Sequence, residues 1–318
     1  MAEVVYRPYQ EGDEVAINDG FNRVFSRQRS LEEWRWKFPA EPEGRWIMVA
    51  VDERGQVLAH YGATATRMRL GGVLLRGGQP VDVYSLPEVR GTRVFTNCYE
   101  EFIARYGNRD GLAVMYGFPG GKHYEMGLKQ LKYVLLRPVP YWRRTVRRRW
   151  RLARWRFRVS RGFERAAAAD LWRRAAARYP FATLKDESWF ERRFTGRSSA
   201  AYQHLVVWRG GSVQACAVIL ARDGVLSLAE LAWDGGDVGA LAALDAELDD
   251  LARATACPSV ETWLGGDATA EAALASLGWE RCPEANDLHM VARCFHDQVD
   301  LQTVAERFYL TMGDADLV

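Results

Sequence analysis

The sequence predicts an α/β (α+β) fold with two tandem domains, each a mixed, mostly antiparallel β-sheet flanked by helices. The chain has 318 residues, which favours two hydrophobic cores over one. Hydrophobic residues make up 48% of it, enough to fill such cores. An internal repeat points the same way, because residues 31–63 align with residues 187–219 without a gap. We therefore expect one α/β unit to occur twice.

The repeated stretch predicts a short helix followed by a β-hairpin. It reads "LEEWRWKFPAEPEGRWIMVAVDERGQVLAHYGA" in the first copy and "ESWFERRFTGRSSAAYQHLVVWRGGSVQACAVI" in the second. Phe38 falls on Phe194, and the turn Arg54-Gly55 falls on Gly210-Gly211. An apolar run, a glycine turn and a second apolar run are typical of a hairpin. Chance similarity between two segments with apolar patterning is the alternative to a duplication.

The flanking segments follow the same order in both halves. Before the repeat, "EVVYRPY" and "RWRFRV" indicate strands, and "GDEVAINDGFNRVF" and "FERAAAADLWRRAAARY" indicate helices. After it, each half continues with a strand, a loop, a helix, another strand and a closing helix. The last three read "FTNCYEEFIARYG", "GLAVMYGF" and "HYEMGLKQLKY" in the first half. In the second half they read "DVGALAALDAELDDLARATA", "PSVETWL" and "DATAEAALASLGW".

Charge divides the chain into three parts. The overall net charge of +2 is the balance of +2 over residues 1–142, +10 over residues 143–165 and −10 over residues 166–318. We therefore expect an N-terminal domain at 1–142, an Arg/Trp-rich connector at 143–154 and a C-terminal domain at 155–318.

The segment "YWRRTVRRRWRLARWRFRVSR" at 141–161 is the strongest anomaly in composition. Trp142, Val146, Trp150 and Ala153 recur near helical spacing, which predicts a short helix leading into the next strand. Its arginines are expected to pair with the acidic second half. RNA binding is a second interpretation, because Arg contacts phosphate and Trp stacks on bases. An anionic membrane surface or an acidic carrier protein is a third.

Several classes of protein are not expected from this sequence. No run approaches 18 apolar residues, so no membrane span is expected. The start "MAEVVYRPYQEGDE" lacks a signal-peptide pattern. The five cysteines include no CxxC pair, which predicts free thiols in a reducing cytoplasm. No metal site is expected, because the spacings of Cys282, His289, Cys294 and His296 match no familiar ligand pattern.

The stretch "LPEVRGTRVF" at 86–95 lies between a predicted strand and a predicted helix, where phosphate-binding turns occur. Such turns usually hold several glycines, because backbone amides must approach the phosphate closely. This one holds only Gly91, with Arg90 and Arg93 on either side. The arginines can contact phosphate directly. The alternative is a solvated loop with two surface arginines.

The order of elements and three short motifs resemble the Gcn5-related N-acetyltransferase (GNAT) superfamily. The motifs are Pro87-Glu-Val-Arg90-Gly91, Tyr116-Gly-Phe-Pro119 and Leu277-Gly-Trp279, and the resemblance is closest to a tandem two-domain bacterial branch. It covers both halves. It implies acyl transfer from acetyl-CoA or another acyl-CoA, with the pyrophosphate bound by backbone amides where the fourth strand meets a helix. The N-terminal domain is then expected to be the catalytic one.

The resemblance also implies which residues bind the cofactor. On the superfamily pattern Arg/Gln-x-x-Gly-x-Gly/Ala, Arg90 takes the first position, while Arg93 and Phe95 replace both glycines. A register shifted by two places Gly91 on a glycine but puts Glu88 first. The expected cofactor-binding residues are Tyr84, Ser85, Leu86, Arg90, Gly91, Thr92, Arg93 and Val94.

The corresponding segment of the second half is "ELAWDGGDVGALAAL" at 230–244. It has Asp234 and Asp237 where an anion would lie, and no arginine. Two carboxylates there would repel a pyrophosphate. We therefore expect the second domain to be a degenerate, non-catalytic copy.

The superfamily reaction needs a proton acceptor for the amine and often a donor for the departing thiolate. The position usually held by a catalytic Tyr is Leu128 in the first half and Leu274 in the second. The candidate catalytic residues are therefore Asp82, Tyr124 and His123. Each also has a structural interpretation, respectively a strand-end carboxylate, a packing ring and a surface ring.

The resulting hypothesis is an N-acyltransferase that moves an acyl group from acyl-CoA, or from a carrier-protein thioester, to a primary amine of a small molecule or peptide. One alternative is an aminoacyl-tRNA-dependent transferase that binds tRNA through the connector. Another is a non-catalytic binding module.

Overall fold

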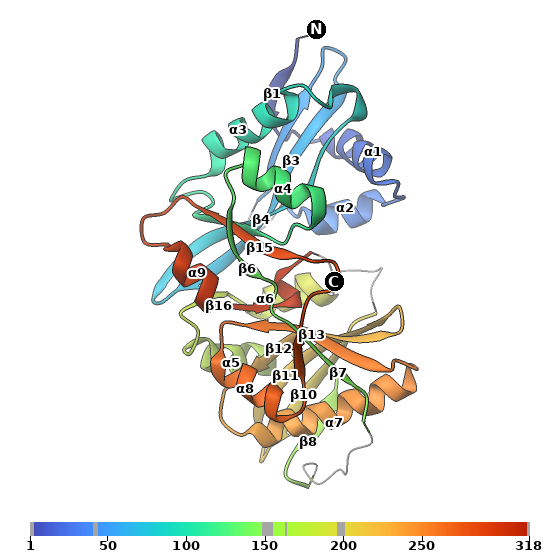
Figure 1. Ribbon diagram of the computed structural model, residues 1–318, viewed down its shortest axis with the longest axis vertical. Helices are drawn as coiled ribbons and strands as arrows, with labels where there is room; N and C mark the ends of the chain where they lie inside the picture. Colours follow the sequence, from blue (N-terminus) through green and yellow to red (C-terminus); the bar gives the residue numbers. More distant parts are fainter. Residues whose placement is uncertain (1–2, 41–43, 148–154, 163, 196–200, 317–318) are drawn as a thin grey trace. The chain divides into compact units, whose positions relative to one another are not determined.

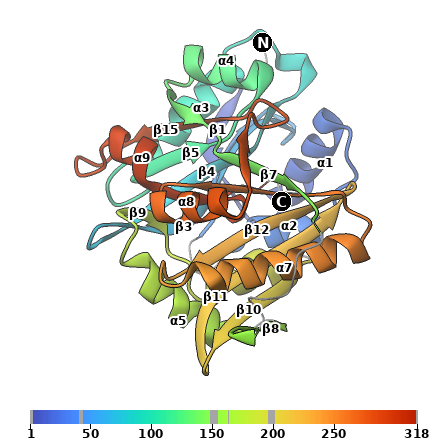
Figure 2. The same ribbon diagram turned by 60° about the horizontal axis from the view of Figure 1, so that its bottom comes forward.

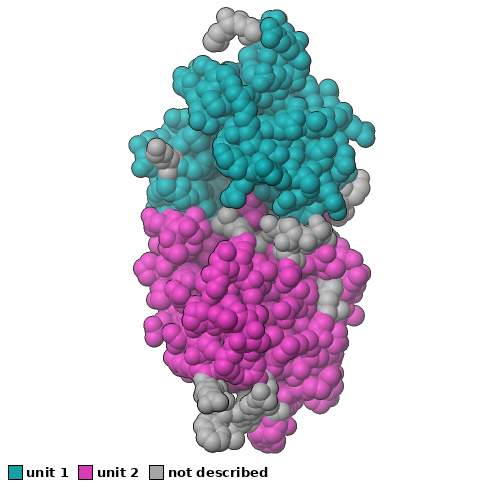
Figure 3. Space-filling model, turned by 90° about the vertical axis from the view of Figure 1, so that its right-hand side faces the viewer, with its two compact units in different colours: residues 1–68, 73–137, 289–302 teal, residues 69–72, 138–288, 303–318 magenta. Residues whose placement is uncertain are grey.

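The computed structural model describes residues 3–40, 44–147, 155–162, 164–195 and 201–316. The chain forms two compact units, which Figure 3 shows in different colours. Unit 1 comprises residues 1–68, 73–137 and 289–302, and unit 2 comprises residues 69–72, 138–288 and 303–318.

Unit 1 is a mixed sheet with the strand order β1-β2-β3-β4-β5-β15-β6 (Figure 1). Only β4 and β5 run parallel, and the other pairs with a described register are antiparallel. The strands are β1 (Val5–Pro8), β2 (Trp46–Val51), β3 (Val57–Leu70), β4 (Val73–Ser85), β5 (Val114–Gly117), β6 (Val134–Pro138) and β15 (His289–Cys294). The helices are α1 (Asp13–Phe25), α2 (Leu31–Lys37), α3 (Val94–Tyr106) and α4 (Gly121–Gln130), and a 3₁₀ turn spans Pro87–Val89.

Helices cover both faces of this sheet because alternate residues of its strands are apolar. On β2, Ile47 and Val49 enter a core with Trp34 of α2. Their neighbours Met48 and Ala50 enter a second core with α3. All four are buried. The alternation follows the two-residue period of a strand. The sheet of unit 1 is therefore the middle layer of three.

Unit 2 repeats this order of elements. Its main sheet is β8-β10-β11-β12-β13-β7-β14, and among its described strand pairs only β12 and β13 run parallel. The strands are β7 (Tyr141–Thr145), β8 (Arg158–Arg161), β10 (Gln203–Arg209), β11 (Ser212–Arg222), β12 (Val225–Trp233), β13 (Ser259–Gly265) and β14 (Glu280–Cys282). Two short strands, β9 (Phe181–Thr183) and β16 (Phe308–Thr311), pair with each other, and β16 also pairs with β13.

The described helices of unit 2 are α5 (Arg165–Ala176), α6 (Glu187–Phe190), α7 (Val238–Ala254) and α8 (Ala268–Ser276), together with most of α9 (Leu301–Arg307), whose first two residues are assigned to unit 1. The longest, α7, packs across β8 and β10–β13 (Figure 2). Asp267 caps α8, because its carboxylate accepts the Thr269 and Ala270 amides at 3.0 and 3.2 Å. The predicted α/β architecture and the helix–hairpin element in each half are confirmed.

The two units exchange one strand each, and this exchange differs from the domain order predicted from the sequence. β7 follows β6 in the chain, yet it lies between β13 and β14 of unit 2. β15 follows β14, yet it lies between β5 and β6 of unit 1. The strand β7, which completes the sheet of unit 2, follows α4 and β6 of unit 1 in the chain. The strand β15, which completes the sheet of unit 1, follows α8 and β14 of unit 2. A short apolar strand has the same residue pattern whichever of the two sheets it joins. The local sequence therefore does not reveal with which strands β7 and β15 pair.

The exchange changes the expected division of the chain. Residues 143–145 were expected in the connector but belong to β7, and residues 289–302 were expected in the C-terminal domain but belong to unit 1. The helix predicted near Trp142 is wrong for residues 141–145, which form a strand. The rest of that prediction, at 148–154, lies outside the described residues.

Arginines of the basic segment pair with acidic residues of unit 2, as one interpretation of the sequence predicted. On β7, Arg144 contacts Asp245 at 2.8 Å and Asp249 at 2.5 Å, and all three side chains are almost fully buried. The same pattern continues with the pairs Arg156–Asp237, Arg161–Glu247 and Arg165–Glu191, at 3.4, 2.7 and 2.7 Å. The strong local charge is therefore partly neutralised within unit 2.

Unit 2 also contains a fully buried lysine. The ammonium group of Lys185 donates to Glu230 at 2.8 and 3.0 Å, to Thr311 at 2.9 Å and to Asp314 at 3.1 Å. Lys185, Glu230 and Asp314 have side-chain exposures of 0%, 1% and 0%. One cation therefore compensates two buried carboxylates. Burial, opposed by the charge of Lys185 and assisted by that of Asp314, raises the pKa of Glu230 to about 7.

This pKa predicts a specific pH dependence of stability. Between pH 4.5 and about 7 the folded state holds a proton on Glu230 that the unfolded chain releases, so stability from this group falls as pH rises. Relative to a Glu230→Gln variant, the wild type should lose roughly 3 kcal/mol across this window. Urea unfolding of both proteins at pH 5 and pH 7.5 measures this loss of stability. Both proteins contain the same buried histidines, so the contribution of these histidines to the pH dependence cancels in the difference. A constant difference between the two proteins would contradict the prediction.

Three further findings concern the described part of the chain. No helix within it is long and apolar enough to cross a membrane. All five cysteines are free thiols, and Cys98, Cys216 and Cys257 are buried. No cluster of three or more His, Cys, Asp or Glu residues suited to a metal occurs among the described residues.

Candidate functional site

Strands β4 and β5 separate in unit 1. They pair through Gly77 with Val114 and Gly78 with Met115, after which β4 continues to Ser85 beyond any such pairing. Pro87–Val89 then forms the 3₁₀ turn, and α3 begins at Val94. Parallel strands that diverge before a helix N-terminus leave a cleft at the end of the sheet.

A cavity of about 430 Å³ lies between the end of β4, the turn before α3, and α4. This groove, as we call it below, is lined by Val83, Tyr84, Ser85, Val89, Arg90, Gly91, Thr92, Phe95, Thr96, His123, Met126 and Gln130. Its volume is within the range of small-molecule sites. Every lining residue belongs to unit 1.

The turn before α3 has the properties of an anion site. Gly91 has φ of +80°, a left-handed conformation that side chains rarely adopt, and a Cβ there would meet nothing within 4 Å. The N-cap residue Arg93 offers no side-chain cap, and the Thr92 hydroxyl accepts only the Val94 amide, at 3.2 Å. The helix N-terminus therefore retains amide donors and a partial positive charge next to the groove.

Arg90 is exposed at the mouth of the groove, and its guanidinium makes no hydrogen bond or ion pair within the described residues. Its neighbour Glu88 is already paired with Arg23. Arg93 differs, because it lies along α3, 3.3 Å from Asn97 and 3.6 Å from Glu100. Of the two arginines, Arg90 is thus the one positioned to meet an anion.

The structure brings five of the eight predicted cofactor residues to the groove: Tyr84, Ser85, Arg90, Gly91 and Thr92. The other three do not line it. Leu86 is 2% exposed and its amide donates to Leu58, while Val94 is 6% exposed and packs in the core. Arg93 caps α3.

Among the predicted catalytic residues, His123 lines the groove and the other two do not. Burial lowers the pKa of His123 below its ordinary value, so the ring is neutral and able to accept a proton at pH 7. Tyr124 instead stacks on His289 at a centroid distance of 4.7 Å.

Asp82 is held in a buried ion-pair cluster. Its carboxylate contacts Arg29 and, at 2.6 Å, Lys37, and its side chain is 1% exposed. Burial opposes ionisation, but the charges of Lys37 and Arg29 outweigh it and keep the pKa of Asp82 below its ordinary value. A carboxylate so stabilised is a poor proton acceptor. This geometry is that of an anchor between the α1–α2 region and β4.

Six residues that line the groove were not predicted from the sequence: Val83, Val89, Phe95, Thr96, Met126 and Gln130. Part of the signal was available. His123, Met126 and Gln130 follow helical spacing of three and four residues, so they share one face of α4. Val83 and Ser85 alternate on β4 and so share one face of that strand.

In unit 2, the helix N-terminus that corresponds to the start of α3 is that of α7, and it is capped by a side chain of unit 2 itself. Asp237 is the N-cap of α7 and accepts the Gly239 amide at 2.8 Å. Arg209 and Arg156 contact the same carboxylate at 3.1 and 3.4 Å. Aspartates lie at this turn, as the sequence predicted. Arginines also lie there, although the segment 230–244 contains none, because Arg156 and Arg209 come from other parts of the chain. An internal carboxylate occupies the position of an anion at this helix N-terminus.

The separation of β12 and β13 in unit 2 is also filled. These strands pair over Val225–Leu228 and Ser259–Thr262, and beyond that point β16 pairs with Leu264 and Gly265 of β13. The equivalent of the unit 1 groove is therefore occupied by the chain's own C-terminal segment.

Comparisons with known proteins agree with this architecture. Residues 5–127 match the family model of the acetyltransferase (GNAT) domain. No curated protein matches the chain in sequence.

Three solved structures illustrate the likeness in fold. A probable N-acyltransferase from Enterococcus faecalis has a TM-score of 0.69 and 15% identity, over 96% of this chain and 75% of that one. A GCN5-related N-acetyltransferase from Anabaena variabilis has a TM-score of 0.64 and 10% identity, over 92% and 73%. Saccharomyces cerevisiae N-myristoyltransferase with bound myristoyl-CoA has a TM-score of 0.58 and 12% identity, over 92% and 83%. The chain therefore has the fold of these N-acyltransferases, and its residues 5–127 match the acetyltransferase (GNAT) domain family.

Proposed function

We propose that the protein is an N-acyltransferase that transfers an acyl group from acyl-CoA to a primary amine of a small molecule or peptide. The observation that supports it most directly is the groove of unit 1. There the uncapped N-terminus of α3, the left-handed Gly91 and the unpaired Arg90 converge beside two separating strands. A pyrophosphate would receive helix amides and a guanidinium at the same place.

The groove also suits the rest of coenzyme A. Its walls combine Val83, Val89, Phe95 and Met126, which can cover an apolar pantetheine arm and acyl chain. A carrier-protein thioester presents the same arm and is an alternative donor. No metal is required for this chemistry, since the thioester is already activated toward an amine.

We further propose that unit 2 is a non-catalytic copy of the same GNAT-like unit, as in a tandem two-domain enzyme. The shared order of elements supports the duplication. Asp237 at the helix N-terminus and β16 between the strands support the absence of a coenzyme site there. The free thiols favour a reducing cytoplasm as the place of action.

Acyl-CoA binding tests the proposal. Thermal-shift or calorimetric titration with acetyl-, octanoyl- and myristoyl-CoA should show binding of at least one to the wild type. Arg90→Ala should weaken it about 10- to 100-fold, because a charge-assisted contact contributes about 1.5–3 kcal/mol. Arg93→Ala should have a smaller effect, since that side chain lies along α3. Arg109→Ala in an exposed loop is the matched control. Absence of binding by every acyl-CoA would sink the proposal.

His123 is proposed as the group that accepts the proton of the amine. His123→Gln should lower kcat by about 10²- to 10⁴-fold with little change in KM, the usual range for general base catalysis. The wild-type rate should rise with pH through an apparent pKa below 6.5, because burial disfavours the charged ring. This increase in rate at acidic pH should be absent from the pH profile of the variant. If the variant showed the same increase in rate at acidic pH, the titrating group would be a residue other than His123.

A further inference from the structure

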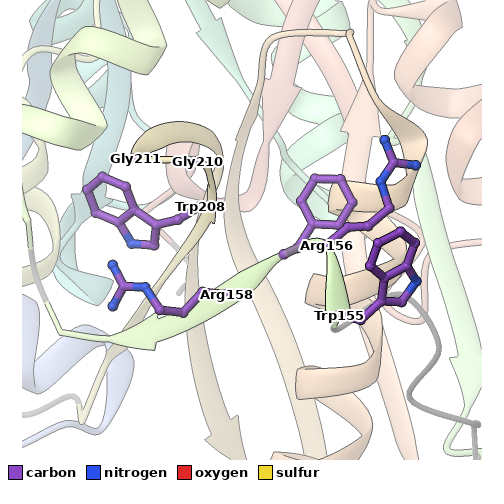
Figure 4. Close-up of a pocket in the computed structure, with 7 residues that line it drawn as sticks. Trp155, Arg156, Arg158, Trp208, Gly210 and Gly211 are labelled. Atoms are coloured by element: carbon purple, nitrogen blue, oxygen red, sulfur yellow. The ribbon is translucent and has the colours of Figure 1, made fainter.

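Unit 2 carries an open hollow of about 330 Å³ at its edge strand β8 (Figure 4). It is lined by Trp155, Arg156, Phe157, Arg158, Trp208, Gly210 and Gly211. β8 is the last strand of the sheet and pairs with β10 on one side only among the described strands. All of its lining residues belong to unit 2, and none of them lines the groove of unit 1.

One wall of the hollow is an arginine stacked on a tryptophan. Arg158 and Trp208 are direct cross-strand partners, and the guanidinium lies 5.4 Å from the ring centroid. The indole N–H donates to the Ser160 hydroxyl at 2.9 Å, which fixes the plane of the ring. Figure 4 shows the two side chains next to each other. This pair is preorganised before any ligand arrives.

The opposite wall is a second arginine–tryptophan pair. Trp155 is 81% exposed, the largest exposure among the large hydrophobic residues described. Arg156 lies 5.8 Å from its ring centroid and is held by Asp237 at 3.4 Å. In Figure 4 both lie on the side of the hollow away from Trp208. An indole left so exposed leaves about 200 Å² of apolar surface in water unless something covers it.

The charge of the hollow is positive. Arg158 makes no ion pair within the described residues, and Arg156 shares the single carboxylate of Asp237 with Arg209. Two guanidinium groups thus share one carboxylate, and the guanidinium of Arg158 has no carboxylate partner among the described residues. The turn Gly210-Gly211 beside them has φ of +53° and +83°, and a Cβ at either glycine would meet nothing within 4 Å. A bulky anion can therefore approach the backbone closely.

We propose that this hollow binds single-stranded nucleic acid, with an unpaired base stacked on Trp155 or Trp208 and the adjoining phosphates on Arg158 and Arg156. Aromatic faces combined with guanidinium groups are the chemistry that holds unpaired nucleotides. A duplex does not fit this role, because its base faces are already covered. An acidic peptide would use the arginines but not the exposed indole. The inference does not rest on the proposed acyl transfer.

Binding is measured on the full chain by fluorescence anisotropy of a labelled, unstructured 12-nucleotide RNA, with tryptophan quenching as the readout of stacking. Trp155→Ala should weaken binding roughly fivefold to 150-fold, the range for loss of one stacked base. Arg158→Gln should make the negative slope of log K against log salt shallower by about 0.7, as expected when one phosphate contact is lost. The controls remove a similar group elsewhere, namely Phe25→Ala at an exposed ring in unit 1 and Arg173→Gln on α5.

The expected result is binding that is tighter for the single strand than for its duplex, and sensitive to both variants but not to the controls. A DNA strand and adenosine 3′,5′-bisphosphate serve as competitors, to separate a preference for RNA or for a lone nucleotide. Equal binding of duplex and single strand, equal effects of Arg158→Gln and Arg173→Gln, or no binding at 50 mM salt would each overturn the proposal. Unchanged melting temperatures and circular dichroism spectra show that the variants are folded.

Discussion

Replacing Lys185 with Met is expected to lower the unfolding free energy of unit 2 by about 3–5 kcal/mol. The ammonium group is completely buried and donates to Glu230, Thr311 and Asp314. Its removal leaves two buried carboxylates next to each other with no cation. The ring faces of Trp172 and Tyr309, within 5.4 Å of the same ammonium, lose a partner as well. The side chains of Lys and Met are similar in size, so the effect reports charge rather than volume.

Thermal unfolding measures this prediction, with an expected fall in the midpoint on the order of 10 °C for a unit of this size. Glu230→Gln in the Lys185→Met background should restore part of the loss, because it removes one of the two unpaired charges. The loss should also be smaller at pH 5, where the proton that Glu230 favours is freely available. A Lys185→Met protein as stable as the wild type at pH 7.5 would show that the lysine is neutral or solvated.

Val291→Asp is expected to unfold unit 1, although it lies far from the groove in sequence. Val291 is 2% exposed on β15, pairs with Gly117 of β5, and belongs to the core cluster that contains Tyr61 and Phe102. An unpaired carboxylate at this place costs about 4 kcal/mol or more. The proposed acyl-CoA binding should disappear with the fold, although every residue that lines the groove is unchanged.

A matched control makes this result specific. Val134→Asp is the same substitution on β6, the strand on the other side of β15, at a valine that is 44% exposed. It should change the unfolding free energy by less than about 0.5 kcal/mol. Hydrogen exchange should show loss of protection in β5 for Val291→Asp alone. Equal behaviour of the two variants would mean that β15 does not complete the sheet of unit 1.

Local structure was largely predictable from the sequence because each element carries its own signal. The amphipathic pattern of "DVGALAALDAELDDLARATA" predicts α7, and the apolar runs around Arg54-Gly55 predict the β2–β3 hairpin. These signals depend on residues a few positions apart. They are therefore present in any window of the sequence.

Side-chain partners across the fold were not predictable in this way. Asp82 looked like a free strand-end carboxylate because Arg29 and Lys37, which neutralise it, lie more than 40 residues earlier in the chain. Asp237 looked like an uncompensated charge because Arg156 and Arg209 come from other elements. In both cases the charge of a residue was visible, but the folded neighbour that decides its chemistry was not.

The groove could be predicted from the sequence in part. The strand–turn–helix context of Gly91 indicated the position of the groove, and six of its twelve lining residues were among the predicted site residues, five for the cofactor and His123 for catalysis. The contribution of α4 was recognised only through His123, although the spacing of Met126 and Gln130 from it fits one helix face. The difference between Arg90 and Arg93 depends on the start of α3, and a helix boundary is the least certain feature of a sequence.

The exchange of β7 and β15 has a consequence for biosynthesis. When residues 1–138 have emerged from the ribosome, the sheet of unit 1 still lacks the strand between β5 and β6. That strand follows about 150 residues later, which at 5–20 residues per second is a delay of roughly 8–30 s. Throughout this interval the nascent chain carries two open strand edges next to a hydrophobic core. Both edges are open to pairing with other nascent copies. The yield of folded protein should therefore depend on translation speed and on chaperones that shield these edges until residue 294 is made.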